Sequence, residues 1–180
     1  VDKVVIFLGI NSGNSFTKGI PLFEAALARL KEKYEDQISI LQTTDVPYAM
    51  YQESYQKAQV ILDQVYAFDQ GYNALEAMAK GKVVFTGAET EFLKHYNLQP
   101  NEVAINALPD VEALVKELSF LIEHPEEIER ISKNAIAFVE KVHDANKVAK
   151  MQAGQIPIYE PGLSINRYHS LLSLLPNCFD

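Results

Sequence analysis

A lysine stands at the end of a polar loop near the start of the chain, immediately before a helical pattern. The loop, residues 9–19, reads GINSGNSFTKG and ends in Lys18 and a glycine. Free backbone N–H groups at the start of a helix attract anions, and a lysine adds a full positive charge. The glycines match neither the GxxxxGK[ST] nor the GxGxxG spacing. The loop therefore indicates an anion site, with a solvated surface lysine as the alternative.

A glutamate near the start of a second helical pattern offers a different kind of contact. Gly71 precedes the helical segment NALEAMAKG, and Glu76 lies close to its first turn. The free N–H groups of such a turn bind phosphate oxygens, and a carboxylate accepts hydrogen bonds from sugar hydroxyls. The alternative is that Glu76 only complements the positive end of the helix dipole.

Short apolar runs that alternate with helical patterns must position these residues. The runs predicted to be strands are residues 4–9, 38–44, 60–65, 83–87 and 103–107. Such runs, continuous rather than alternating and separated by helices, are typical of a parallel sheet covered on both faces. We predict an α/β fold with a Rossmann-like open parallel sheet. Ligands bind outside the carboxyl ends of such strands, which makes the loops 10–19, 44–48, 64–72 and 86–91 the candidate site.

The helical patterns carry recognisable start and stop signals. Apolar residues at helical spacing follow Ile20, and two further stripes lie between residues 111 and 142. Asp110 is the predicted cap of the first stripe, and Pro125 is predicted to begin the second. Gly81 is predicted to end the helix that contains Glu76.

The composition suits one globular domain and limits the classes of partner. The chain has 180 residues, of which 48% are hydrophobic, and a net charge of −8. This charge argues against nucleic acid and anionic membranes as partners. No apolar run reaches the length of a membrane span, and a single cysteine fits a cytoplasmic protein. An apolar run that begins within three residues of Val1 favours a chain cut from a longer protein.

Several stretches together resemble one enzyme family. GYNALEAMAKGKVVFTGAE resembles the LEAMA segment of retaining glycosyltransferases of the GT-B fold, in glycosyltransferase family 4. The KG before an amphipathic helix, VPYAMYQESYQKAQVILDQ and FVEKVHDANKVAKM resemble further motifs of that family, in its order and spacing. The resemblance covers about residues 4–151. It implies a nucleotide-sugar-binding domain over 1–151, one half of a GT-B fold, followed by a tail, 152–180, of unknown role.

The resemblance also implies roles for individual residues. Lys18 would contact the diphosphate of a donor, Glu76 would bind its ribose, and these two form the expected catalytic pair. The full donor-binding set that the resemblance implies is Gly9, Asn11, Lys18, Gly19, Val46, Tyr48, Gly71, Asn73, Ala74, Leu75 and Glu76. Within it, the backbone around Asn73, Ala74 and Leu75 would meet the phosphates, and Val46 and Tyr48 would lie near the base.

The activity that the resemblance implies is sugar transfer with retention of configuration. The donor would be a UDP- or GDP-sugar, and no metal or other cofactor would be obligatory. A glycan or lipid-linked acceptor would bind through an N-terminal domain that this chain lacks, so the chain alone is expected to be inactive. The expected location is the cytoplasm, with the missing domain providing any peripheral attachment to a membrane.

The sequence departs from the family at two points. The family has a glutamate eight residues before position 76, where this chain has Phe68. Asp63 and Asp69 are the candidates to replace it, although neither has the right spacing. The family also has an arginine after the glycine of its first loop, where Ile10 and Asn11 stand here. Which residues of this chain would contact the donor sugar, and which would supply the other half of the phosphate-binding contacts, is therefore left open.

Two other functions are compatible with the same pattern of elements. A receiver-like or other non-catalytic α/β nucleotide-binding module would share the fold, but a receiver requires acidic residues after its first strand, and this loop has none. A sugar-nucleotide epimerase would require additional carboxylates and a histidine. The four histidines are scattered and indicate no metal site. The helical spacing of Tyr48, Tyr51 and Tyr55 predicts packing.

Overall fold

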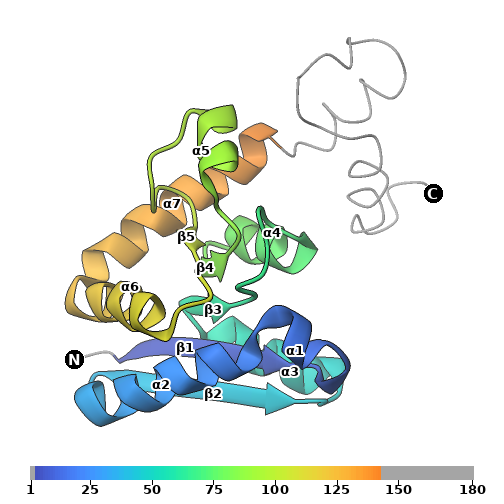
Figure 1. Ribbon diagram of the computed structural model, residues 1–180, viewed down its shortest axis with the longest axis vertical. Helices are drawn as coiled ribbons and strands as arrows, with labels where there is room; N and C mark the ends of the chain where they lie inside the picture. Colours follow the sequence, from blue (N-terminus) through green and yellow to red (C-terminus); the bar gives the residue numbers. More distant parts are fainter. Residues whose placement is uncertain (1–2, 143–180) are drawn as a thin grey trace. The chain divides into compact units, whose positions relative to one another are not determined.

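The computed structural model of the chain describes residues 3–142 (Figure 1). The chain divides into two compact units, residues 1–136 and 137–180. The strands and helices below belong to the first unit, except for the end of the last helix, α7, which spans Pro125–Val142. The expected tail, 152–180, and most of the closing segment FVEKVHDANKVAKM lie outside the described residues, so the domain boundary at residue 151 stays a prediction.

A parallel sheet forms the centre of the first unit. Its strands are β1 (Val4–Ile10), β2 (Ile38–Thr44), β3 (Val60–Leu62), β4 (Val83–Thr86) and β5 (Ile105–Asn106). They lie in the order β2-β1-β3-β4-β5, and each neighbouring pair is parallel. The predicted Rossmann-like α/β fold is confirmed. β3 is shorter than the predicted run, because the N–H of Val65 donates to the carbonyl of Lys18 and not to a neighbouring strand.

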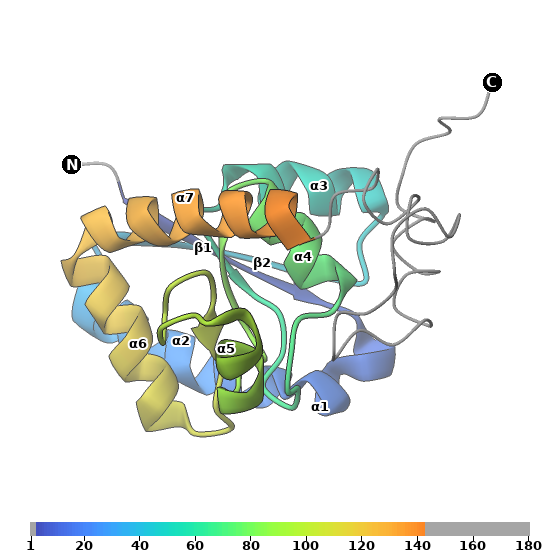
Figure 2. The ribbon, with the colours of Figure 1, turned by 90° about the horizontal axis from the view of Figure 1, so that it is seen from above.

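Helices cover both faces of the sheet (Figure 2). They are α1 (Ser15–Lys18), α2 (Ile20–Tyr34), α3 (Tyr48–Lys57), α4 (Tyr72–Ala79), α5 (Thr90–Tyr96) and α6 (Val111–Glu123), with a 3₁₀ turn, η1, at Ser12–Asn14. α2 and α6 pack together on one face, and α3 and α4 lie on the other. Because side chains alternate along a strand, Ile6 and Leu8 of β1 join the core under α2 and α6, whereas Phe7 meets the tyrosines of α3.

A left-handed glycine separates α1 from α2. Gly19 has φ 71° and ends α1, and its N–H donates to the carbonyl of Phe16. A methyl group at Gly19 would lie 2.2 Å from Cγ2 of Val65. Both the backbone angle and the close approach require glycine. The break turns Lys18 out of the long helix and toward the carboxyl end of β3.

The predicted start and stop signals are confirmed. The side chain of Asp110 accepts a hydrogen bond from the N–H of Ala113 and caps α6. Pro125 is the first residue of α7. Gly81 takes a left-handed φ of 72° two residues after the end of α4.

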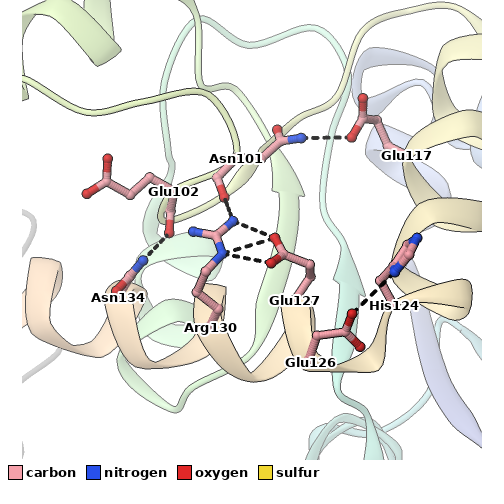
Figure 3. Close-up of polar contacts among 8 residues, drawn as sticks. All are labelled: Asn101, Glu102, Glu117, His124, Glu126, Glu127, Arg130 and Asn134. Carbon is pink, nitrogen blue, oxygen red and sulfur yellow. Dashed lines mark hydrogen bonds and ion pairs between the residues drawn. The ribbon is translucent and has the colours of Figure 1, made fainter.

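The first half of α7 holds the loop before β5 (Figure 3). Arg130 donates to the carbonyl of Asn101 at 3.0 Å, and Asn134 donates to the carbonyl of Glu102 at 3.1 Å. The side chain of Asn101 reaches Glu117 of α6 at 2.8 Å. Because this loop precedes β5, it lies at the amino end of the sheet, away from the loops that were expected to bind a ligand. The cluster therefore supports the fold.

Candidate functional site

A cavity of about 360 Å³ opens at the carboxyl ends of β1 and β3. Its size falls in the range typical of small-molecule sites. Seven of the sequence-predicted residues line it: Gly9, Asn11, Lys18, Val46, Tyr48, Asn73 and Glu76. The loops after β1 and β2 and the start of α4 thus meet at one place. The other four predicted residues, Gly19, Gly71, Ala74 and Leu75, do not line the cavity. The binding roles of all eleven residues stay predictions.

Lys18 is held in the cavity wall by a buried carboxylate. Its Nζ lies 2.9 Å from Oδ1 of Asp63, whose side chain is only 5% exposed. The hydroxyl of Thr86, the last residue of β4, donates to Oδ2 of Asp63 at 3.1 Å. These contacts connect Thr86 at the end of β4, through Asp63 directly after β3, to Lys18 at the end of α1. They leave the Lys18 ammonium partly exposed to the cavity, with its side chain 22% exposed.

Glu76 reaches the same cavity from α4. Its Oε1 accepts a hydrogen bond from Lys80 at 2.6 Å, one helical turn later. Gly71 caps the helix with its backbone alone, and the N–H of Leu75 is the first to bond back, to the carbonyl of Gly71. The N–H groups of Tyr72 and Asn73, in the first turn, therefore have no partner within the helix. A carboxylate and a helix N-terminus lie side by side, as the sequence predicted.

The loop after β2 contributes a third carboxylate, after those of Asp63 and Glu76. Asp45 adopts a left-handed φ of 49° and accepts hydrogen bonds from the backbone N–H and the hydroxyl of Ser12. These two bonds hold the pKa of the Asp45 carboxyl below its usual value. They also tie the loop after β2 to the loop after β1. Val46 follows directly and lines the cavity.

Three tyrosines of α3 form a stack along one wall. The rings of Tyr48 and Tyr51 are 6.4 Å apart and those of Tyr51 and Tyr55 are 5.9 Å apart, both nearly parallel. Phe7 meets the Tyr51 ring edge-on at 5.1 Å. Burial raises the pKa of Tyr51 to about 12, and the nearby charge of Asp63 contributes. Tyr55 is buried, as the helical spacing predicted, but the Tyr48 ring is 71% exposed.

The structure brings in residues that the sequence alone did not single out as site residues. Asp45, Tyr51 and Tyr55 line the cavity. Thr86 is not in the lining but contacts it through a hydrogen bond to Asp63. The tyrosine spacing on α3, directly after a candidate loop, was the available signal for a cavity wall. The spacing alone does not separate a cavity wall from ordinary core packing, because it serves both purposes.

The two positions at which the sequence departs from the family have different surroundings in the structure. Phe68 is 84% exposed and does not line the cavity. Of the two aspartates considered as replacements for a glutamate at position 68, Asp63 lines the cavity and Asp69 does not. Ile10 and Asn11 both line it, at the position where the family has an arginine. The side-chain oxygen Oδ1 of Asn11 accepts from the N–H of Gly13 at 2.9 Å and so shapes the turn η1.

A second hollow, of about 410 Å³, lies between α2 and the edge strand β2. Leu27, Ile38 and Ile40 are among its lining residues. It lies along the side of β2, includes none of the loops after the strands, and contains none of the predicted site residues. The cavity of about 360 Å³, at the carboxyl ends of the strands, is therefore the better candidate for a ligand site.

The described residues contain neither a cluster of metal ligands nor a helix suited to cross a membrane. Within residues 3–142, no group of three or more histidine, cysteine, aspartate or glutamate side chains is placed to hold a metal ion. In the same part of the chain, no helix has the length and apolar character that crossing a bilayer demands.

The chain is similar to known glycosyltransferases in sequence pattern and in fold. A family model described as glycosyl transferase-like matches residues 13–152. No curated protein matches the sequence significantly. The C-terminal domain of a glycosyl transferase group 1 family protein, LpcC, from Francisella tularensis has a TM-score of 0.56 and 17% identity. That match covers 78% of this chain and 86% of the domain.

Two longer proteins share the same fold. Sucrose-phosphate synthase from Thermosynechococcus elongatus has a TM-score of 0.57 and 20% identity, over 96% of this chain. UDP-GlcNAc 2-epimerase from Neisseria meningitidis, bound to UDP-GlcNAc, has a TM-score of 0.52 and 17% identity, over 78% of this chain. The chain spans 46% and 43% of the lengths of these two proteins. At such identities the similarity shows the fold alone.

The family match extends over most of the sequence, from the loop that contains Lys18 to beyond α7. The parallel sheet, its covering helices and the neighbouring folds agree with it. This chain therefore belongs to the glycosyl transferase-like family, with the Rossmann-like fold of a GT-B glycosyltransferase domain.

Proposed function

We propose that this chain is the donor-binding domain of a retaining glycosyltransferase that uses a nucleotide diphosphate sugar. One observation carries the proposal. Lys18 and Glu76, which come from elements far apart in the sequence, line the same cavity at the carboxyl ends of the strands. A phosphate-binding cation and a carboxylate suited to sugar hydroxyls are what a nucleotide sugar requires.

The diphosphate would lie between Lys18 and the start of α4. The Lys18 ammonium has three N–H donors, and Asp63 accepts from one of them. The N–H groups of Tyr72 and Asn73 at the helix start would bind further phosphate oxygens, and the helix dipole favours the negative charge. In sugar transfer, negative charge develops on the leaving diphosphate. Stabilising that charge would be the main catalytic contribution of this domain.

The nucleoside would extend toward α3. Lys80 contacts Oε1 of Glu76, which leaves Oε2 to accept hydrogen bonds from the ribose. The base would lie against Val46 and the exposed ring of Tyr48, because both line the cavity next to the loop after β2. Aromatic rings stack on any nucleobase. The choice between UDP- and GDP-sugars would follow from backbone contacts in this loop.

The acceptor, a glycan or a lipid-linked sugar, would bind through a second domain. Three aromatic residues from the loops at the carboxyl edge are strongly exposed: Phe16 at 85%, Phe68 at 84% and Tyr66 at 59%. Such exposed apolar rings are suited to contact with a covering domain. On this proposal the chain alone binds a donor but does not transfer the sugar. The retaining stereochemistry rests on the family resemblance.

The proposal includes no obligatory metal ion. A titration in the presence of EDTA should therefore give the same affinity as one with Mg²⁺. The cytoplasmic location, with peripheral membrane attachment through the second domain, is also part of the proposal and rests on the sequence features described above.

Two alternatives share features with this structure. The strand order β2-β1-β3-β4-β5 and an aspartate after β3 are also found in receiver-like modules, but the loop after β1 has no acidic residue. The UDP-GlcNAc 2-epimerase neighbour has the same fold, but no histidine within residues 3–142 lines the cavity. Donor binding is the function that the cavity supports best.

Calorimetric titration of the 180-residue chain with UDP, GDP, ADP and their glucose conjugates tests the proposal. We expect saturable binding of one nucleotide, weakened about 10-fold or more in Lys18→Met and in Glu76→Gln, because each removes a contact to a charged group. Lys133→Met, which removes only an exposed pair on α7, is the control. Absence of binding by every nucleotide to the folded wild-type chain would contradict the proposal.

A further inference from the structure

We propose that Asp63 is a positioning residue that holds the Lys18 ammonium in place for the diphosphate of the donor. The inference rests on the proposed function and adds a residue to it. It also gives Asp63 a role other than replacing the sugar-binding glutamate that is absent at position 68. The basis is the chain of side chains from Thr86 through Asp63 to Lys18.

The geometry fixes the Asp63 carboxylate before any ligand arrives. Its side chain is 5% exposed, Oδ1 lies 2.9 Å from the Lys18 ammonium, and Oδ2 accepts from Thr86 at 3.1 Å. Thr86 itself is fully buried. The backbone N–H of Asp63 donates to the carbonyl of Phe85 at 3.0 Å. The carboxylate is thus fastened to β4 by its backbone and by its side chain.

The backbone of Lys18 is fastened to the same region. Its carbonyl accepts from the N–H of Val65 at 3.1 Å, two residues after Asp63. The lysine is therefore held at its carbonyl and at its ammonium, and its flexible side chain spans the distance between them. A free lysine side chain loses much rotamer freedom when it binds a phosphate. Here that loss has already occurred, so diphosphate binding costs less entropy.

Both oxygens of Asp63 already accept hydrogen bonds from protein groups. Leaving this buried carboxylate without its cation would be unfavourable, because an unpaired buried charge is costly. Lys18 therefore stays on Asp63 when the diphosphate binds, and offers its two remaining N–H donors to the phosphate oxygens. This makes the pair a fixed donor platform at the cavity wall.

Neutralising Asp63 could change diphosphate affinity in either direction. The direction of the change therefore tests the inference. If Asp63 were only a negative charge near an anion site, its neutralisation would strengthen diphosphate binding. If Asp63 positions Lys18, its neutralisation weakens binding, and only when Lys18 is present. The comparison requires Asp63→Asn in the wild-type background and in a Lys18→Met background.

The experiment is a calorimetric titration of the full chain with UDP and with inorganic pyrophosphate. We expect Asp63→Asn to weaken UDP binding about 10-fold in the wild-type background and to leave it unchanged in the Lys18→Met background, because the residues act as one unit. Thr86→Val, which keeps the shape and removes the hydroxyl, should weaken binding about 3-fold, and Thr86→Ser should restore it. Glu129→Gln, at an exposed ion pair on α7, is the matched control.

A spectroscopic measurement adds a readout that is independent of affinity. The ¹⁵N relaxation of the Lys18 ammonium should show an ordered group in the wild-type chain and in Thr86→Ser, and a mobile one in Asp63→Asn. Equal or tighter UDP binding by folded Asp63→Asn, or an equal loss in the Lys18→Met background, would overturn the inference alone. If Asp63→Asn does not fold, Thr86→Val and its serine rescue decide the matter. Absence of wild-type binding would overturn the donor-binding proposal and this inference with it.

Discussion

Gly9 and Tyr51 approach each other so closely that no side chain fits between them. A methyl group at Gly9 would lie 2.5 Å from Cε2 of Tyr51. Gly9 lies near the carboxyl end of β1, and the Tyr51 ring stacks between those of Tyr48 and Tyr55. Glycine at this position therefore lets the tyrosine stack lie directly over the strand and form the wall of the cavity.

Gly9→Ala should disturb both stability and binding. The added methyl group must push the Tyr51 ring away, and overpacking of this kind costs about 1–3 kcal/mol of unfolding free energy. Urea denaturation measures the loss, and titration with UDP measures the effect on the cavity. Full wild-type stability and affinity in Gly9→Ala would show that the ring moves without cost.

Gly19→Ala should be more harmful than alanine at another glycine of the site. Gly19 combines a φ of 71° with a close approach of 2.2 Å to Val65, so we expect a loss of about 2–4 kcal/mol from backbone strain and overpacking together. Gly71→Ala is the matched control. A methyl group there would meet only Gln64, at 3.7 Å, and the φ of −84° suits alanine, so the loss should be smaller, about 1 kcal/mol from the poorer N-cap. A large stability loss in Gly71→Ala would contradict this account.

Ser12→Ala should change the titration of Asp45. The two hydrogen bonds from Ser12 lower the pKa of the Asp45 carboxyl. Removing the hydroxyl should move that pKa upward toward its ordinary value of 3.8. A carboxyl with a lowered pKa stabilises the fold above its unfolded pKa, and the contribution is lost as the pH falls through the folded pKa. Carbon-13 NMR of the Asp45 carboxyl measures the change in pKa. An unchanged pKa in Ser12→Ala would contradict this prediction.

Tyr51→Phe should protect the fold against alkaline pH. Burial raises the pKa of Tyr51 from 10.0 to about 12. A group whose pKa is raised in the folded state contributes its full stability below its unfolded pKa and loses it as the pH rises toward the folded pKa. Between pH 10 and 12, the unfolding free energy of the wild-type chain should fall more steeply than that of Tyr51→Phe. Tyr48→Phe, at the exposed end of the stack, should behave like the wild type.

Arg130→Met should destabilise the fold without affecting the cavity. Arg130 pairs with Glu127 at 2.7 Å and donates to the carbonyl of Asn101 in the loop before β5. The side chain is 43% exposed, so a loss of only about 1 kcal/mol is expected. Thermal denaturation measures it. Lys133→Met, at a more exposed pair on the same helix, should have no measurable effect, and nucleotide affinity should be unchanged in both variants.

Most of the fold could be predicted from local signals. Continuous apolar runs that alternate with helices indicated the parallel sheet, and Asp110, Pro125 and Gly81 marked helix ends that the structure confirms. The length of β3 could not be predicted, because the run VILDQV continues to an apolar Val65 and has no glycine or proline to mark an end at Leu62. A contact with the carbonyl of Lys18, from a distant part of the chain, redirects Val65.

The candidate site was predictable in outline only. Lys18 and Glu76 could be placed together because the carboxyl ends of parallel strands meet at one edge. The contact between Asp63 and Thr86 could not be predicted, because it depends on the register that sets Leu62 opposite Phe85 in the sheet. No local pattern contains that register. The role of the tyrosines was missed for another reason, since one helical spacing serves a packed core and a cavity wall equally.

The cavity has a consequence for how such a domain can be altered. Among the residues that the structure describes, those that line it run from Phe7 to Glu76, in one continuous part of the chain. Thr86 supports it from β4, while α6 and the described part of α7 come later in the sequence. A chimera that exchanges this single stretch between relatives would move these lining residues together into a new scaffold. On the proposed function, such an exchange should transfer the donor preference as well.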